Sequence, residues 1–346
     1  MAQALPDPDA MVLLARRLPK AELHQHLTGS LRPSSWVRAT AHMDEPAGIP
    51  RLSRAFDNLG YHKFFSDLDE AARLMGGGPG IVAETLRMIE SAFDAGVRHL
   101  EVMCTPALHA QAGVDIETAL RSVGEGLRIA HGELGMSGGI IVELHRPDGA
   151  DAAIDTVRRS RDLRAAGLPI LGYGSDGNHR NVPLATLAPA YELARSEGFP
   201  LTGHAMSLDD VAVALDLGFE RIDHGWIAAT DTSYVRRLVA SGAVMTLTPM
   251  AYLLGGHAAP IHWTEAATVL YQAGVPLVVA TDDPALHHTD LAHSYELMAR
   301  GLHWTPAELA EAARVGFRSA WSATTDVEDI VATIDALAMD PRRSPT

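Results

Sequence analysis

The chain has 346 residues, of which 47% are hydrophobic and only 5% are aromatic, a composition typical of a soluble protein with an aliphatic core. Its 28 basic and 43 acidic residues give a net charge of −15, which argues against a phosphate-rich partner such as nucleic acid or an anionic membrane surface. Cys104 is the only cysteine, so the sequence excludes an intrachain disulfide and a cysteine-based metal cluster.

The sequence contains no recognisable targeting or membrane-spanning segment. The apolar run at 11–15 is too short for a signal peptide, and no run approaches the length of a membrane span. We therefore expect a cytoplasmic protein that acts on a small molecule, without a nucleic-acid or membrane partner. The oligomeric state is left open.

A helix is expected around residues 9–17, and a short buried strand follows it. Within the apolar setting of Leu23 and Leu27, this strand carries His24 and His26. Because successive side chains of a strand point to opposite faces, the two histidines share one face. A pair of neutral imidazoles suits a divalent metal such as zinc, although strand histidines capped by backbone carbonyls are the alternative.

Helical patterning then recurs in pieces between residues 30 and 96, after which strand-like runs alternate with helices. The helical pieces are 34–37, 61–75 and 80–95. The strand-like runs are 97–106, 138–145, 169–177, 200–207, 221–225, 244–249 and 276–284. The helices expected between them are 116–134, 151–166, 184–197, 208–217, 232–240 and 264–273.

With the histidine strand, this pattern gives eight parallel β-α units and predicts an α/β TIM (β/α)8 barrel with extra helices after the first strand. A doubly wound open sheet is the alternative. Gly172, Gly174 and Gly177 match the spacing of a dinucleotide-binding loop, but they lie at the end of the fourth strand with no helix start after them. No segment has the composition of a linker, so residues 1–346 are expected to form one domain.

Residues of the types that bind metals lie on or near the ends of the predicted strands, where barrels of this kind carry their active sites. They are His24, His26, His204, His224, Asp282 and Asp283. Any one buried histidine is more often a core residue, but the joint placement favours a site. Three histidines and one carboxylate suit zinc, with a coordination position left for water.

Four motifs carry a resemblance to a known family. They are Pro-Lys-Ala-Glu-Leu-His-Gln-His-Leu at 19–27, Gly-His-Ala at 203–205, Arg-Ile-Asp-His-Gly at 221–225 and Thr-Asp-Asp-Pro at 281–284. In order and spacing the chain resembles the adenosine/AMP deaminase family of zinc amidohydrolases over essentially its whole length. The resemblance implies an amidohydrolase-like barrel, a hydrolase of C–N bonds, and one zinc ion held by His24, His26, His204 and Asp282.

The resemblance also implies roles for other residues. His224 would orient and deprotonate the attacking water, and Asp283 would hydrogen-bond the substrate ring. The substrate-facing residues would be His26, Thr28, Gly177, Met206 and Asp283. Related amidohydrolases bridge two metals with a carbamylated lysine on the fourth strand, but the only lysines here, Lys20 and Lys63, lie elsewhere. One zinc ion per chain is therefore expected.

The chain departs from the family on the substrate side. The family reads His-Ala-Gly-Glu where this chain has His204, Ala205, Met206 and Ser207, and the missing glutamate is the family's proton donor. A serine hydroxyl is too weak an acid to replace it, and general acid catalysis contributes roughly 10² to 10⁴ in rate. Met206 would reshape the floor of the pocket. Thr28 stands where adenosine-specific members carry an aspartate.

Several groups could supply the missing proton. The candidates are Asp209, Glu143, His179 and a water held by Ser207. Asp209 has an alternative explanation as a helix-start residue, and Glu143 as the partner of an arginine such as Arg146.

The expected function is zinc-dependent hydrolytic deamination, or a related hydrolysis, of a purine-like nucleoside, base or other nitrogen heterocycle. The altered position 207 is expected to change its specificity. Two alternatives stay open. One is a zinc enzyme of the same fold with another reaction, such as amide or ring hydrolysis or a lyase step in specialised metabolism. The other is a catalytically silent protein that binds a ligand.

Overall fold

The structure is a computed structural model that describes residues 8–40, 61–178, 180–254, 260–322 and 327–340. Its strands are β1 (Lys20–His26), β2 (Val97–Cys104), β3 (Ser137–His145), β4 (Ile170–Asp176), β5 (His204–Ala205), β6 (Arg221–His224), β7 (Val244–Leu247) and β8 (Leu277–Val279). The α-helices of the first half are α1 (Pro8–Arg17), α2 (Pro33–Thr40), α4 (Tyr61–Met75), α5 (Gly78–Asp94), α6 (Pro106–Gln111), α7 (Ile116–Leu134) and α8 (Gly149–Ala165). Those of the second half are α9 (Ala188–Ser196), α10 (Leu208–Asp216), α11 (Thr232–Ser241), α12 (Pro249–Leu254), α13 (Trp263–Ala273), α14 (Leu291–Leu302), α15 (Pro306–Arg318) and α16 (Val327–Met339).

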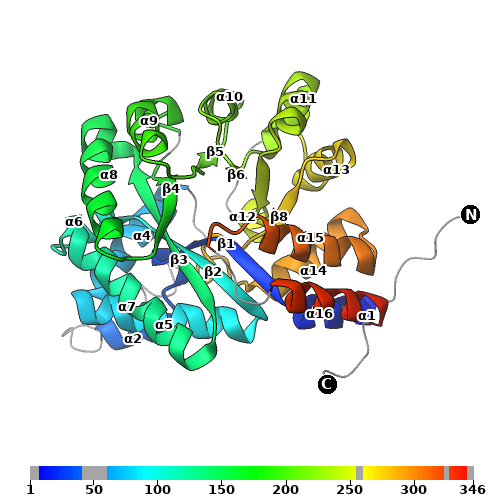
Figure 1. The fold of residues 1–346 in the computed structure, drawn as a ribbon, viewed down its shortest axis with the longest axis horizontal. Coiled ribbons are helices and arrows are strands. Elements are labelled where there is room, and N and C mark those ends of the chain that lie inside the picture. Colours follow the sequence, from blue (N-terminus) through cyan, green and yellow to red (C-terminus); the bar gives the residue numbers. More distant parts are fainter. Residues whose placement is uncertain (1–7, 41–60, 179, 255–259, 323–326, 341–346) are drawn as a thin grey trace, which may run out of the picture.

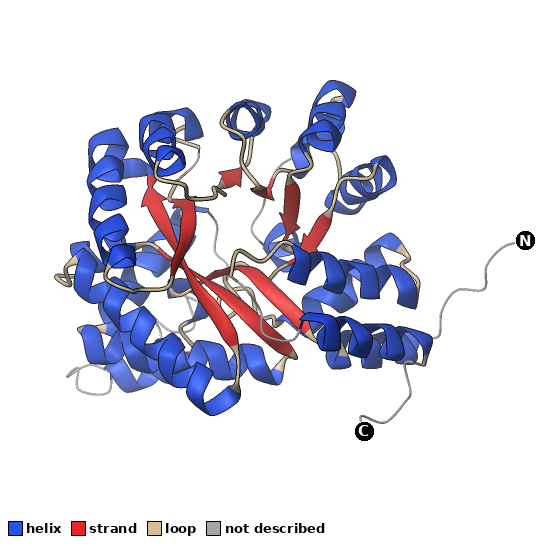
Figure 2. Cartoon of the chain, viewed as in Figure 1, coloured by secondary structure: helices blue, strands red, loops and turns tan. Residues whose placement is uncertain are grey.

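All strand pairs are parallel, in two four-stranded sheets with the orders β1-β2-β3-β4 and β5-β6-β7-β8. Two isolated parallel bridges join the sheets: Gln25 pairs with Asp282, and Tyr173 pairs with Leu201. The strands thus surround a common interior, with helices on the outside (Figures 1 and 2). This is the TIM-barrel architecture that the alternation of strands and helices predicts.

The predicted elements agree with the structure within a few residues, except on two strands. The helices 61–75 and 116–134 have the predicted bounds. The regular strands β5 and β8 are much shorter than the runs 200–207 and 276–284, because the chain leaves regular pairing where it enters the site. The helix at 184–197 divides into a 3₁₀ turn, Leu184–Leu187, and α9.

Local signals explain where helices begin and end. The Asp115 side chain accepts a hydrogen bond from Thr118 N at the start of α7, and Gly135 ends that helix with φ of 65°. Helix α15 begins with a complete capping box, in which Thr305 and Glu308 satisfy each other's backbone N–H groups. These caps fix the helices that pack against the barrel.

Strand β1 is buried on both faces, so its residues do not alternate between buried and exposed positions. Its outward face packs against α15, where a Cβ added to Gly316 would lie 3.5 Å from the Cβ of Ala21. Its inward face points His24 and His26 into the mouth of the barrel. On the same side, α4 covers the loop after β8 by stacking Phe64 on His287 with ring centroids 5.7 Å apart.

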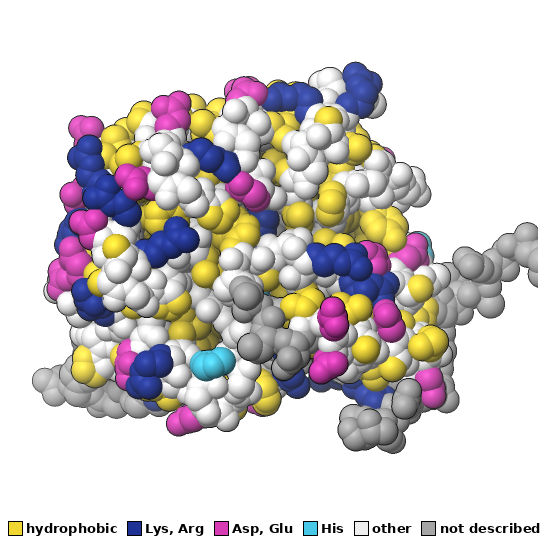
Figure 3. All heavy atoms as spheres, in the orientation of Figure 1, with side chains coloured by type: hydrophobic (Ala, Val, Ile, Leu, Met, Phe, Trp, Pro, Cys, Tyr) yellow, Lys and Arg dark blue, Asp and Glu magenta, His cyan; other side chains and the backbone are white. Residues whose placement is uncertain are grey.

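The surface carries charges of both signs close together. On the face drawn in Figure 3, basic and acidic side chains are interspersed. Exposed ion pairs such as Arg161–Glu197 at 3.0 Å illustrate the pattern. Within the described ranges, no helix is long and apolar enough to cross a membrane.

Candidate metal centre and active site

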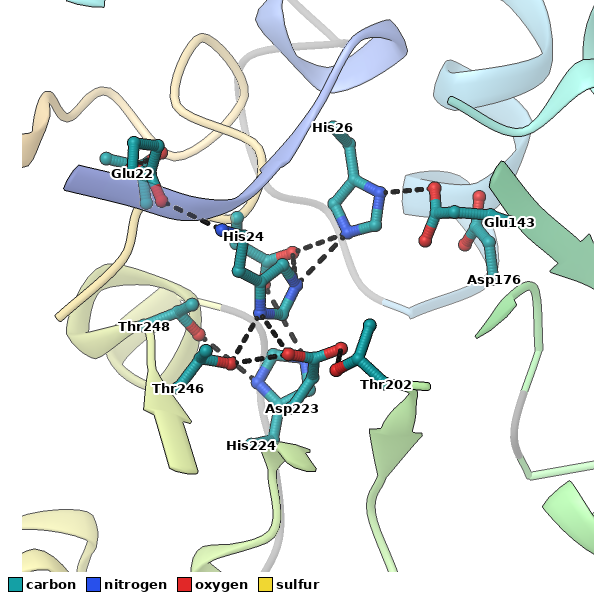
Figure 4. A network of polar contacts seen from close by, with 12 residues as sticks. Glu22, His24, His26, Glu143, Asp176, Thr202, Asp223, His224, Thr246 and Thr248 are labelled. Carbon is teal, nitrogen blue, oxygen red and sulfur yellow. Dashed lines mark hydrogen bonds and ion pairs between the residues drawn. The ribbon is translucent and has the colours of Figure 1, made fainter. Parts of the chain in front are cut away.

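The structure brings four predicted ligands together in one group. His24 and His26 come from β1, His204 from β5 and Asp282 from the segment after β8. One ligand atom of each lies within 4.8 Å of all the others. Three lone-pair atoms are especially close: the Nε2 atoms of His24 and His26 are 3.2 Å apart, and Asp282 Oδ1 lies 3.4 and 3.2 Å from them (Figure 4).

The far nitrogen of His24 is held by a buried polar chain. Its Nδ1 lies 3.0 Å from Thr246 Oγ1 and 3.5 Å from Asp223 Oδ1. Asp223, fully buried on β6, accepts hydrogen bonds from Thr246 at 2.7 Å and from Thr202 at 2.7 Å. The carboxylate therefore favours the tautomer with the proton on Nδ1, which leaves the Nε2 lone pair of His24 facing the group.

His26 is oriented in the same way by another carboxylate. Its Nδ1 lies 2.9 Å from Glu143 Oε2, and the hydroxyl of Thr105 also donates to Glu143 at 2.9 Å. In the neutral rings that bind a metal, with both Nδ1 atoms protonated, the facing Nε2 atoms of His24 and His26 are both acceptors and cannot bond to each other. A cation between them resolves this conflict.

Burial lowers the pKa of His26, but the negative charges of Glu143, Asp283 and Asp282 outweigh burial and hold it well above its ordinary value. Burial and the neighbouring imidazoles His24, His26 and His224 hold the pKa of His204 well below its ordinary value. The Nε2 of His204 is buried without a hydrogen-bond partner. A neutral imidazole with a free lone pair is the form that binds a metal.

Asp282 and His224 have strained backbones at the mouth of the barrel. Their φ angles are 67° and 63°, in the left-handed region that side-chain-bearing residues rarely adopt. His224 Nε2 lies 3.8 Å from Asp282 Oδ2, and its Nδ1 lies 3.2 Å from Thr248 Oγ1. The strain thus turns both side chains toward the common centre, and His224 stands beside the ligand group without belonging to it.

The predicted substrate-side residues lie around the same mouth. Asp283 is buried, its Oδ1 has no hydrogen-bond partner, and burial and then Asp282 raise its pKa well above the ordinary value. A side chain at Gly29 would overlap Asp283, so position 29 requires glycine. Thr28 is buried in the turn after β1. Gly177 has φ of 100°, and a Cβ there would lie 2.6 Å from Pro147.

The two altered positions lie between β5 and α10. Met206 is half-buried, and Ser207 is exposed at the N-cap of α10, where its hydroxyl accepts a hydrogen bond from Asp210 N at 3.1 Å. Asp209 lies exposed in the first turn of the same helix, as its helix-start interpretation expects. His179 lies outside the described residues.

One alternative from the sequence is wrong. Glu143 does not pair with Arg146, which instead lies 3.3 Å from Asp210 and donates to the backbone carbonyl of His204. The buried guanidinium thereby supports the strand end that carries His204. Sequence reasoning mentioned Glu143 only as a proton donor or arginine partner, and the structure shows it bound to His26.

Sequence reasoning missed several supporting residues. They are Thr105, Asp176, Thr202, Asp223, Thr246, Thr248 and Tyr252, all of them buried. Polar residues at inward-facing positions of apolar strands could have pointed to Asp223 and Thr246. Tyr252, whose hydroxyl lies 3.4 Å from His224 Nδ1, comes from α12 and had no such signal.

The barrel and the three-histidine, one-aspartate centre define a TIM-barrel hydrolase of the amidohydrolase type. The chain belongs to the adenosine deaminase family, whose model, described as Adenosine deaminase, matches residues 19–337. This membership makes the chain a hydrolase of C–N bonds, as the motifs predicted, and the group of four ligands fits the single zinc ion that the family's motif implies.

Similar proteins agree with this assignment. An adenine deaminase of Chlorobium luteolum is 28% identical over 313 residues, covering 87% of this chain and 89% of the relative. The crystal structure of an adenine deaminase from Arthrobacter aurescens matches with a TM-score of 0.84 and 24% identity, covering 93% of this chain and 99% of that one. An amidohydrolase from Burkholderia ambifaria with bound zinc matches with a TM-score of 0.83 and 24% identity, covering 98% and 97%.

Proposed function

We propose that the chain is a zinc-dependent deaminase of a purine-like base, nucleoside or related nitrogen heterocycle. The observation that supports this most strongly is the convergence of His24, His26, His204 and Asp282, in which the buried Nε2 of His204 has no hydrogen-bond partner among the described residues. The deaminase names of the relatives support the reaction type.

The proposed roles follow from chemistry and position. Zinc, when bound by these four residues, supplies a Lewis acid that lowers the pKa of water toward neutrality. His224 accepts the proton of the attacking water, because its Nδ1 is held by Thr248 and its Nε2 faces the centre. Asp283 offers its unpartnered Oδ1 to the substrate ring. The turn at Gly177 lies at the same mouth, where its backbone N–H donates to Asp176 Oδ1.

Ser207 replaces the family's acid, and we propose that this replacement alters specificity. Its hydroxyl caps α10 and is exposed, so its position supports a structural role at the helix start. Protonation of a ring nitrogen must then come from another group or from water. A substrate whose reacting carbon is already electron-poor needs less assistance and fits this site better.

Ammonia release from a panel of aminopurines and their nucleosides tests the proposal directly, with zinc measured in the same preparation. We expect about one zinc per chain and release of ammonia from at least one member. A zinc-loaded protein that releases no ammonia but hydrolyses an amide or a ring supports the different-reaction alternative. A protein that binds ligands without turnover supports the silent one.

Ser207→Glu tests the specificity proposal. Because a general acid contributes roughly 10² to 10⁴ in rate, the variant should gain adenine or adenosine deamination by about that factor if only the donor is missing. Ser207→Gln is the matched control, since it has a similar size without an acidic proton. No gain with Glu, at unchanged zinc content, would show that the pocket around Thr28 and Met206 excludes these substrates.

A further inference from the structure

A second pair of buried carboxylates lies beside the proposed metal centre. Glu143 lies two residues before the end of β3, Asp176 ends β4, and the two residues are 1% and 4% exposed. Ligand-type atoms of Glu143, Asp176 and His26 lie within 4.8 Å of one another. Figure 4 shows the two carboxylates next to each other, on the far side of His26 from His24.

The protein supplies too few donors for these four oxygens. Thr105 Oγ1 donates to Glu143 Oε2 at 2.9 Å and to Asp176 Oδ2 at 2.7 Å, yet a hydroxyl has one proton. His26 Nδ1 serves Glu143 Oε2, and Gly177 N donates to Asp176 Oδ1 at 2.5 Å. Glu143 Oε1 is buried and has no hydrogen-bond partner in the part of the chain that the structure describes.

Arg146, the arginine nearest to Glu143 in the sequence, does not relieve the shortage. Arg146, three residues after Glu143, is committed to Asp210 and to the carbonyl of His204. Asp282 and Asp283 add negative charge close to His26. On the covering helix α4, burial raises the pKa of Asp69, His145 opposes this rise, and the charge of Asp176 adds to it. An unpaired buried carboxylate oxygen is costly, so the arrangement calls for a donor from outside the chain.

We infer that Glu143 and Asp176, bridged by Thr105, form a specificity wall that accepts an N–H donor of the substrate and rejects phosphate. The substrate is then an uncharged or cationic amino-heterocycle with a donor besides the amino group that leaves. This inference rests on the proposed function and narrows its substrate class. A carboxylate accepts donors and repels anions, so a phosphorylated nucleotide is disfavoured.

The alternative is that Glu143 and Asp176 only orient His26. The two explanations predict different ratios of adenine affinity to AMP affinity. We compare adenine with AMP as calorimetric ligands and as substrates, for the zinc-loaded wild type and Asp176→Asn. Asparagine keeps the shape of the side chain and removes its charge. Asp216→Asn, an exposed aspartate of α10, is the matched control.

We expect the wild type to prefer adenine over AMP by at least about tenfold, since a hydrogen bond to a charged group contributes about that factor or more. Asp176→Asn should reduce this preference about tenfold or more at unchanged zinc content, while Asp216→Asn leaves it unaltered. If Asp176→Asn does not fold, Glu143→Gln provides the same comparison, with zinc content measured because Glu143 contacts His26.

Three results overturn the inference: equal binding of AMP and adenine by the wild type, an unchanged ratio in the variant, or no binding of either ligand. Binding of adenine with the expected ratio but without ammonia release contradicts the proposed deaminase function and leaves the specificity wall intact.

Discussion

The two ends of the barrel bury charge in opposite ways. Below the site, Glu101 in the middle of β2 and Arg221 at the start of β6 form an ion pair of 2.6 Å. The Arg221 guanidinium stacks 3.5 Å above the ring of Trp321, and its nitrogens make no hydrogen bond among the described residues, so the ion pair is what balances this buried charge. At the C-terminal ends, His204 Nε2, Glu143 Oε1 and Asp283 Oδ1 are buried with neither a hydrogen-bond partner nor an ion-pair partner among the described residues.

The difference shows where the chain needs a ligand. A buried charge is tolerated when the protein supplies its partner, as Arg221 does for Glu101. At the mouth the partners are missing on several side chains at once, and the missing groups are a cation and a hydrogen-bond donor. The Glu101–Arg221 ion pair therefore contributes to stability, whereas the C-terminal ends of the strands are suited to bind a metal ion and a substrate.

Among changes at the C-terminal ends of the strands, removing a proposed zinc ligand should have the largest effect on zinc binding and activity. His204→Ala is expected to lose bound zinc and activity together, because a site with one histidine fewer no longer has a full donor set. Metal analysis and ammonia release measure both losses. His131→Ala, on an exposed histidine of α7, is the control. A fully active, zinc-free His204→Ala protein would refute the proposed centre.

Breaking the Glu101–Arg221 ion pair should lower the stability of the protein without changing the proposed metal centre. Arg221→Met leaves Glu101 buried without its partner, so the free energy of unfolding should fall by about 3–5 kcal/mol. Urea unfolding measures the change, and zinc per folded chain should stay constant. Glu101→Gln combined with Arg221→Met should cost less than the sum of the single changes. Additive losses would show that the pair is not coupled.

Weakening the support of a ligand should have a smaller effect than deleting the ligand. Asp223→Asn removes the charge that orients His24 through Thr246, and we expect zinc affinity to fall about 10- to 100-fold. Competition with a chelator measures the affinity, with Asp216→Asn as the exposed control. An unchanged affinity would mean that the hydroxyl of Thr246 alone orients His24.

The smallest expected effect is a pH dependence of the free energy of unfolding. Burial lowers the pKa of Lys20, at the start of β1, from 10.5 to about 7. Between these values the unfolded chain binds a proton that the folded protein does not, so the free energy of unfolding should rise with pH across this window. Lys20→Met should flatten the rise, as followed by urea unfolding. An identical pH dependence of the free energy of unfolding in the wild type and in Lys20→Met would contradict the lowered pKa of Lys20.

The sequence predicted the fold well because its signals are local and repeated. Alternating strand and helix patterns predicted eight parallel strands, and the family motifs predicted that His24, His26, His204 and Asp282 would meet. The site-residue roles and the single-domain organisation stay predictions. The contacts within the supporting network were missed, because Thr105 follows β2 while Glu143 and Asp176 lie on β3 and β4, and no local pattern reveals the mutual register of these strands.

By itself, the sequence determined the barrel, its family and the residues able to hold one metal ion, since periodicity and motif spacing are written along the chain. Only the tertiary structure decided which polar atoms remain without partners, because that depends on distances between segments far apart in sequence. Those distances turn Arg146 toward Asp210 and leave Glu143 Oε1 without a donor.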